Sequence, residues 1–354
     1  STSWDTYRLN PKRFADAGFN FFNHFGFLRT AERTPGKELE ELLGRLDIMQ
    51  ANGMKLAVST GIFHEHYRYR IKEMGGLKTM EEKTAYILKG LSAHPAVLFY
   101  YVSDEVPEEY LDDVVKMRNV CNSTDPYHPT MTLTNDPKLL PKFAWSGDIF
   151  CMDSYPLGRR SAGRDLLMIP EAMRPARRTG VPIWGYVQAF NWGYYNADCK
   201  TPEDYAQFHD PNSDEVLAMT LLFAIEGAKG FLFYADPYVT TTMEKCKLFG
   251  DPGYPDRNWE NMIPAIQELK ALEPYLLGTK SPPEVTVKDQ GNSPVAARAF
   301  ASDQGKTTIL LVSRKDGKAE AVITVPGCTN LKSKFGKTKS LGNDRYQFSG
   351  EAID

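Results

Sequence analysis

The chain has 354 residues, 42% of them hydrophobic and 12% aromatic, and its 42 basic and 45 acidic side chains give a net charge of −3. This balance argues against a nucleic-acid surface, which normally has a basic excess. No apolar run reaches the roughly 18 residues of a membrane span. The apolar content excludes a disordered protein, and five cysteines are too few for a disulfide scaffold. The length fits one α/β barrel of roughly 250 residues with an appendage, or two ordinary domains.

Up to about residue 278, short apolar runs alternate with helix-length segments, which is typical of βα units. Seven strands are predicted, at 19–25, 55–60, 96–103, 130–135, 148–154, 182–190 and 230–235. Helices are predicted at 11–17, 38–52, 79–91, 108–120, 214–226 and 261–272. Seven strands are one short of a closed (β/α)8 barrel, and we expect a first strand at residues 1–4 or upstream. A doubly wound sheet is the alternative, but no glycine-rich phosphate loop follows any strand.

Beyond a linker-like stretch at 278–283, strands follow one another without helices. They are predicted at 285–288, 296–301, 307–313, 319–325 and 345–348. The predicted fold class is therefore α/β: a (β/α)8 TIM barrel over residues 1–278, followed by a small all-β, sandwich-like domain over residues 279–354. Because the β domain has few aromatic residues, we expect it to brace the barrel rather than to bind glycan.

Cysteines and histidines give little support for metal binding. The odd cysteine count leaves at least one unpaired thiol; Cys199 and Cys246 could form a bridge, but free thiols are the favoured interpretation. His64 and His66 flank Glu65, yet neither an HExxH pattern nor a third histidine at ligand spacing accompanies them. We therefore interpret them as loop histidines and predict no metal.

In barrel enzymes the working residues lie where each strand ends and its following loop begins. Reading those positions along the chain gives carboxylates, amides and aromatic rings: Asp104, Glu105, Asn135, Asp136, Asp153, Tyr155, Trp184, Tyr186, Gln188, Trp192, Tyr194, Tyr234 and Asp236. Single Asp or Asn residues at strand ends also cap helices. Carboxylates supply acid/base groups for glycosidic cleavage, and aromatic rings stack on sugars. The set as a whole therefore favours a carbohydrate site.

Four segments, in order, follow a known pattern. HPAVLFYYVSDE at 94–105, DIFCMDSYP at 148–156, PIWGYVQAF at 182–190 and EVLAMTLLFAIEGAKGFLFY at 215–234 resemble segments of glycoside-hydrolase-like TIM barrels of the clan A and β-galactosidase-like superfamily. The resemblance extends over most of residues 14–278, and a small β domain often accompanies such barrels. The resemblance implies a barrel that acts on carbohydrate, with Glu105 as the acid/base at the end of the fourth strand.

One position departs from the family pattern. Retaining enzymes of clan A carry a nucleophilic glutamate at the end of strand seven, where this chain has Gln188, and an amide cannot form the covalent glycosyl intermediate. Three interpretations stay open. Asp153, or after it Asp236, is the second carboxylate; Asp104 steadies the substrate's own 2-acetamido group beside Glu105; or catalysis is lost and the barrel only binds carbohydrate.

The sequence thus predicts a glycoside hydrolase acting on an oligo- or polysaccharide, with Glu105 as general acid and neither a metal nor an organic cofactor. Hydrogen bonds to sugar hydroxyls are expected from Tyr155, Gln188, Asn135 and Asp136. Aromatic subsites are expected from Trp184, Tyr186, Trp192, Tyr194 and Tyr234. A secreted or periplasmic location follows from the substrate class, and the near-neutral charge favours an uncharged glycan.

Overall fold

A computed structural model describes residues 10–238, 240–351 and 353. The strand expected at residues 1–4 lies outside the described residues. The chain forms two compact units, one holding the chain up to Asp153 with Pro175–Trp184 and Tyr238–Thr240. The other is made of Ser154–Arg174, Gly185–Pro237 and Thr241–Asp354. The domain boundary predicted after residue 278 stays a prediction.

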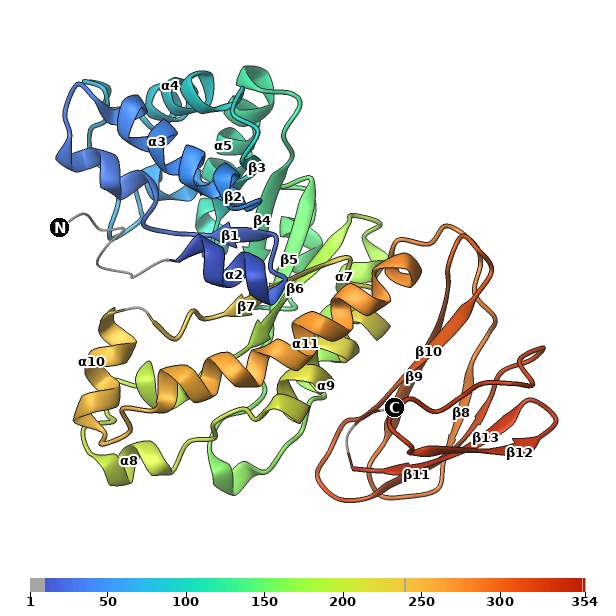
Figure 1. Cartoon of the computed structure of the whole chain (residues 1–354). Coiled ribbons are helices and arrows are strands. Elements are labelled where there is room, and N and C mark those ends of the chain that lie inside the picture. Colours follow the sequence, from blue (N-terminus) through green and yellow to red (C-terminus); the bar gives the residue numbers. More distant parts are fainter. Residues whose placement is uncertain (1–9, 239, 352, 354) are drawn as a thin grey trace. The chain divides into compact units, whose positions relative to one another are not determined.

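Among the described residues, seven strands form one sheet in the order β1 to β7 (Figure 1). They are β1 (Phe21–Asn23), β2 (Lys55–Ser59), β3 (Val97–Ser103), β4 (Thr130–Thr134), β5 (Ile149–Asp153), β6 (Ile183–Gln188) and β7 (Gly230–Tyr234). The pairs from β1 to β5 are parallel. Beyond them, the Phe150 N–H donates to the Pro182 carbonyl at 2.9 Å, and the Ala189 N–H to the Tyr234 carbonyl at 2.7 Å. All seven predicted strands are confirmed, as is the barrel-type fold class.

Helices alternate with these strands. They are α2 (Pro11–Ala17), α3 (Glu38–Ala51), α4 (Met80–Leu91), α5 (Leu111–Thr124), α6 (Leu140–Phe143), α7 (Met168–Arg178), α8 (Pro202–Ala206), α9 (Ser213–Ile225), α10 (Thr240–Leu248) and α11 (Tyr254–Leu276). Short 3-10 turns are η1 (Leu28–Arg33), η2 (Thr60–Phe63), η3 (Glu108–Tyr110), η4 (Arg160–Ala162) and η5 (Trp192–Tyr194). Capping boxes begin α4 at Thr79 and α9 at Asn212. The prediction of 261–272 is too short at both ends, because α11 begins at Tyr254 and continues through Pro274 to Leu276.

The C-terminal strands form two antiparallel sheets. One pairs β9 (Val295–Ala301) with β10 (Thr307–Ser313), and the other has the order β12 (Thr338–Gly342), β13 (Arg345–Gly350), β11 (Ala319–Thr324), β8 (Thr286–Asp289). Side chains from both sheets share a buried core that includes Val295, Leu311, Ile323 and Phe348. This is the predicted sandwich-like arrangement. Strand β12 is absent from the prediction because it is almost entirely exposed and so shows no apolar pattern.

Candidate active site

Three carboxylates lie at the carboxyl ends of two strands of the first unit. Asp104 and Glu105 directly follow β3, and Asp153 is the last residue of β5. Only β4 separates these strands in the sheet. The carboxyl ends of parallel strands meet at one edge, where barrel enzymes place their catalytic groups.

Asp153 is the buried member of this group, with 6% of its surface exposed. Its Oδ1 is buried without a hydrogen-bond partner in the described structure. Burial raises the pKa of Asp153 far above its ordinary value, and the adjacent Glu105 carboxyl adds to the effect through a hydrogen bond and its charge. Two carboxyls so close cannot both ionise readily. Asp153 therefore keeps its proton at neutral pH, in hydrogen-bonding contact with Glu105, and we call these two carboxyls the Glu105–Asp153 pair.

Asp104 lines a recess at the same edge. The Tyr101 hydroxyl donates a hydrogen bond to Asp104 Oδ1 at 2.8 Å. Enclosure by protein atoms raises the pKa of Asp104 to about 6; the Tyr101 hydrogen bond opposes the rise, and the charge of Glu105 adds to it. Solvent still reaches the residue, because its side chain opens on the recess. The carboxyl is consequently close to half-protonated in mildly acidic solution.

The recess has a cavity volume of about 30 Å³, room for a small substituent or about two water molecules. Its walls include Phe25, Tyr67 and Tyr101, together with His64 and His66, and among the residues that the structure describes no lysine or arginine lines it. Burial lowers the pKa of both histidines, so they are neutral at pH 7. Among the described residues, no group of three or more His, Cys, Asp or Glu side chains could hold a metal ion.

Glu105 has an unusual backbone conformation, with φ at +47°. Non-glycine residues adopt this left-handed region infrequently. The other described non-glycine residues with positive φ, Asn343 and Asp344, lie in the turn between β12 and β13. Backbone strain of this kind concentrates at functional sites, and here it holds the acidic side chain that follows β3.

Aromatic rings cluster in the second unit. We define the aromatic platform as Tyr155, Phe190, Trp192, Tyr195 and Tyr234. Phe190 is buried at its centre, with ring-centroid distances to the other four between 4.9 and 5.5 Å. Those four rings are partly exposed, and Tyr195 is 42% exposed. The platform therefore presents apolar ring surface to solvent in a packed, fixed arrangement.

Gln188, at the position of the missing nucleophile, is fully buried at the end of β6. Its Nε2 donates to the carbonyls of Leu157 (2.7 Å) and Phe190 (3.1 Å), and its Oε1 accepts from the Leu157 N–H at 2.9 Å. A carboxylate could not make the two donations. The Gln188 amide therefore links the backbone at Leu157, after β5, to the backbone at Phe190, after β6. Its predicted contact with a sugar hydroxyl stays a prediction.

The other predicted residues have separate settings, and their contacts with sugar stay predictions. Asn135 and Asp136 follow β4, where Asp136 Oδ1 accepts from the Lys138 N–H at 2.8 Å. Trp184 is half-buried and packs against Phe21 and Phe99, with centroid distances of 5.5 and 5.4 Å.

Three further predicted residues belong to the second unit. Tyr186 is buried, with its ring centroid 6.5 Å from that of Tyr234. Asp236 follows β7 and is half-buried. Tyr194 lies in a buried cluster with Cys199, Tyr205, Cys246, Phe249 and Tyr254. Both of these cysteines are free thiols, as favoured.

Sequence reasoning missed Tyr101 and Tyr195. Tyr101 lies three residues before Asp104 within β3, where its apolar surroundings suggest only a core residue. Tyr195 is three residues after Trp192, and side chains with that spacing overlie one another in a 3-10 turn. The spacing is a signal that could identify Tyr195 once η5 is known.

Comparisons with known proteins bear on the fold. No protein-family model and no curated protein matches the chain. A glycoside hydrolase family 5 structure from Bacteroides vulgatus is similar at a TM-score of 0.55 and 12% identity, covering 98% of this chain and 85% of that one. A noncanonic maltogenic α-amylase from Thermotoga neapolitana is similar at a TM-score of 0.53 and 10% identity, covering 100% and 95%.

A β-galactosidase from the psychrophilic Marinomonas ef1 is similar at a TM-score of 0.50 and 15% identity. The match covers 74% of this chain, which spans only 57% of the length of that enzyme. At such identities the likeness is one of fold. The chain therefore has the fold of glycoside-hydrolase TIM barrels with a C-terminal β domain, as the resemblance predicts. No described helix is long and apolar enough to cross a membrane.

Proposed function

We propose that the protein is a glycoside hydrolase that cleaves glycosidic bonds of an oligo- or polysaccharide, with Glu105 as the general acid/base. The observation that carries the proposal is the position of Glu105 at the carboxyl edge of the sheet beside Asp153, a buried carboxyl whose pKa burial raises far above its ordinary value. A carboxyl that keeps a proton at neutral pH is what protonation of a leaving oxygen requires. The glycoside-hydrolase fold supports the same reading.

The two members of the pair have different exposure, which assigns their roles. Glu105 is open to solvent and Asp153 is buried. In the proposed reaction Glu105 transfers the pair's proton to the glycosidic oxygen as the C–O bond breaks, and the negative charge left on the two carboxyls stabilises the positive charge that develops at the anomeric carbon. Hydrogen-bonded carboxyls are closer than the roughly 5 Å between acid and nucleophile in retaining enzymes. Asp153 therefore acts as the proton partner of Glu105 rather than as the attacking group.

Asp104 is the proposed second catalytic group. Tyr101 orients its carboxyl, which can either accept the proton of an attacking water or bind the N–H of a substrate 2-acetamido group. In the first case, the water oxygen bonds to the anomeric carbon. In the second, the substrate's own carbonyl oxygen does so before water replaces it.

The recess favours an uncharged sugar. Its neutral histidines and lack of lysine and arginine leave nothing to pair with a uronate, sulfate or phosphate group. Asp104 would repel such groups when ionised. A neutral or N-acetylated glycan is the proposed substrate class, and a secreted or periplasmic location is proposed with it.

A non-catalytic carbohydrate-binding barrel is the second candidate. The Gln188 amide favours it, because its backbone hydrogen bonds occupy the place of a strand-seven nucleophile. Such a protein would retain the aromatic platform for binding and would tolerate loss of the Glu105 carboxyl.

The test compares Glu105→Gln with the matched control Glu109→Gln on a panel of aryl glycosides and polysaccharides. Glu109 is exposed in η3 and lies outside the carboxylate group. We expect the wild type to cleave at least one substrate, Glu105→Gln to be about 100-fold slower or worse, and the control to be unchanged. A loss below tenfold would show that Glu105 is not the acid. Binding without cleavage by the wild type would support the second candidate.

A further inference from the structure

We propose that Asn191 and Asp210 are positioning residues that set the aromatic platform for sugar binding. The proposal rests on the proposed function, because it assigns the platform a glycan. Asn191 and Asp210 are not among the predicted site residues, and both belong to the second unit, as does the platform.

The segment 190–195 sends its side chains in two directions. Phe190, Trp192 and Tyr195 join the aromatic platform. Asn191 is fully buried, and Tyr194 packs against Tyr205 and Tyr254 with centroid distances of 4.9 and 4.4 Å. The platform rings are therefore displayed by a short turn whose other side is anchored.

Asn191 uses both ends of its amide in that anchor. Its Oδ1 accepts from the Gly193 N–H at 2.7 Å and caps the turn that carries Trp192. Its Nδ2 donates to Asp210 Oδ1 at 2.7 Å, and its backbone N–H donates to the Tyr254 hydroxyl at 3.2 Å. Capping alone would require only the oxygen. The amide nitrogen thus connects the turn to a carboxylate elsewhere in the unit.

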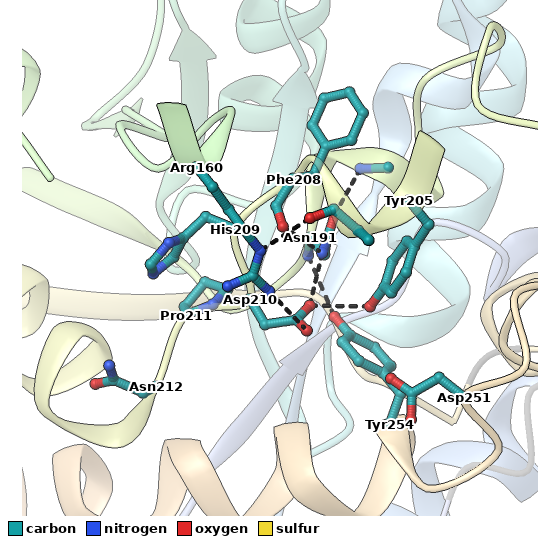
Figure 2. A network of polar contacts seen from close by, with 12 residues as sticks. Arg160, Asn191, Tyr205, Phe208, His209, Asp210, Pro211, Asn212, Asp251 and Tyr254 are labelled. Carbon is teal, nitrogen blue, oxygen red and sulfur yellow. Dashed lines mark hydrogen bonds and ion pairs between the residues drawn. The ribbon is translucent and has the colours of Figure 1, made fainter. Parts of the chain in front are cut away.

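Asp210 joins several segments, as Figure 2 shows. The Tyr205 hydroxyl donates to the same Oδ1 at 2.9 Å. Arg160 and Arg257 lie 3.8 and 3.9 Å from Oδ2, and Arg257 also pairs with Asp251 at 2.5 Å. The Asp210 carboxylate thus interacts with Arg160 in the loop after β5, with Tyr205 before α9 and with Arg257 near the start of α11. The same carboxylate accepts the hydrogen bond from the Asn191 amide.

The turn at Gly193 packs closely against Tyr205 and Asn191. A Cβ at Gly193 would lie 2.8 Å from Tyr205 Cδ2 and 3.0 Å from Asn191 Oδ1, so the turn packs directly on the residues that hold it. A small displacement of Asn191 would move Trp192 and Tyr195 together. Because neither ring carries the proposed proton transfer, the displacement should weaken binding more than it slows chemistry.

An exchange of the two side chains tests the pair. Asn191→Asp places a carboxylate against Asp210 and should break the contact through like-charge repulsion. Combining it with Asp210→Asn restores complementarity: the new Nδ2 can donate to the new carboxylate and to the Tyr205 hydroxyl, and the amide oxygen faces the two arginines. Asn196→Asp is the matched control in the same loop, because Asn196 Oδ1 accepts only a local bond from the Asp198 N–H. Tyr205→Phe, which removes one donor to Asp210, is a milder variant in case Asn191→Asp does not fold.

Two measurements separate positioning from general stability. In protein labelled with 5-fluorotryptophan, the Trp192 resonance, assigned with Trp192→Phe, should move in Asn191→Asp, return in the exchanged pair and stay in place in the control. On a glycan substrate from the panel above, KM should rise about tenfold in Asn191→Asp, as for loss of a ring contact. The kcat value should stay within about twofold, and the exchange should restore KM.

An unmoved Trp192 resonance, or a kcat loss without a KM change, would overturn the proposal. If no glycan binds the wild type, the proposed function fails, and the fluorine spectra still decide whether the pair positions the platform.

Discussion

The two ends of strand β5 carry aspartates in opposite situations. Asp148 precedes the strand at the amino edge of the sheet, and Asp153 ends it at the carboxyl edge. Burial acts to raise the pKa of both. At Asp148, hydrogen bonds from Thr130 and Arg118 outweigh burial and lower the pKa, whereas at Asp153 the neighbouring carboxyls add to burial and raise it.

The hydrogen-bond partners of Asp148 and the acidic neighbours of Asp153 explain why the two pKa values shift in opposite directions. Asp148 accepts from the Thr130 N–H at 2.9 Å, the Thr130 hydroxyl at 2.8 Å and Arg118 at 2.6 Å. Asp125, near the same edge, accepts from the Tyr100 hydroxyl at 2.5 Å and faces His128 at 2.7 Å. Asp148 and Asp125 thus have donors that hold the structure, whereas the neighbours that most affect Asp153 are the carboxyls of Glu105 and Asp104. A perturbed carboxyl without structural donors is the stronger indication of chemistry.

Asp153→Asn should give the largest effect. The amide matches the carboxyl in size and can still donate to Glu105, but it cannot share a proton. We expect kcat/KM on the best substrate to fall about 100-fold or more, with no loss of unfolding free energy at pH 7. A variant that unfolds more easily but remains active would place Asp153 with the structural acids of the amino edge.

Gln188→Glu should give the second-largest effect, a loss of stability without a gain of activity. A position at a strand end does not by itself make a residue catalytic. The new carboxylate would face the carbonyl oxygens of Leu157 and Phe190 in a fully buried site, which costs about 3 kcal/mol at pH 7. Protonation returns one donor, so urea denaturation should show a smaller deficit at pH 5. Gln50→Glu, on exposed surface of α3, is the control. A gain of activity in Gln188→Glu would contradict a structural role.

Asp148→Asn should have the smallest effect and should act on stability alone. Loss of the charged hydrogen bonds should cost about 1–2 kcal/mol of unfolding free energy, with activity retained. Because the folded pKa is lowered, the carboxylate stabilises above its unfolded pKa, near 3.8, and this contribution disappears as pH falls through the folded value. Denaturation curves of variant and wild type should differ at pH 7 and converge in acid, as the pH falls through the lowered folded pKa of Asp148. An activity loss comparable to that of Asp153→Asn would contradict a purely structural role of Asp148.

The fold could be predicted because its strongest signals are local. All seven barrel strands are short apolar runs, which parallel sheets with both faces covered require. Helix α7 has no counterpart in the prediction, although its buried residues Ile169, Ala172, Met173 and Ala176 recur at helical spacing. Two prolines, Pro170 and Pro175, lie in the same segment and disfavour a helix locally, so the helix depends on the burial of its apolar face.

The candidate site could be predicted as a set of strand ends but not as a set of contacts. The positions of Asp104, Glu105 and Asp153 follow from the barrel rule, whereas the raised pKa of Asp153 depends on burial and on the approach of side chains from separate strands. Tyr194 and Tyr195 show the same limit at a finer scale. A 3-10 turn aligns Trp192 with Tyr195 and turns Tyr194 into the buried cluster, and adjacent tyrosines offer no sequence signal for that choice.

Helix α9 is apolar on nearly all sides, and the C-terminal strands help to keep it buried. Eleven of its 13 residues, Glu215 to Ile225, are buried, so the helix has no water-compatible face over most of its length. Helix α11 covers it in part (Figure 1), strands β9 and β10 contact it as well, and Arg298 donates to the Ile225 carbonyl at 2.9 Å. A chain that ends before β8 would expose to water the part of α9 that β9 and β10 cover. Exposed apolar surface of this kind promotes self-association. A shortened or fused form of the barrel should therefore keep the C-terminal sheets, because strands β9 and β10 cover part of α9.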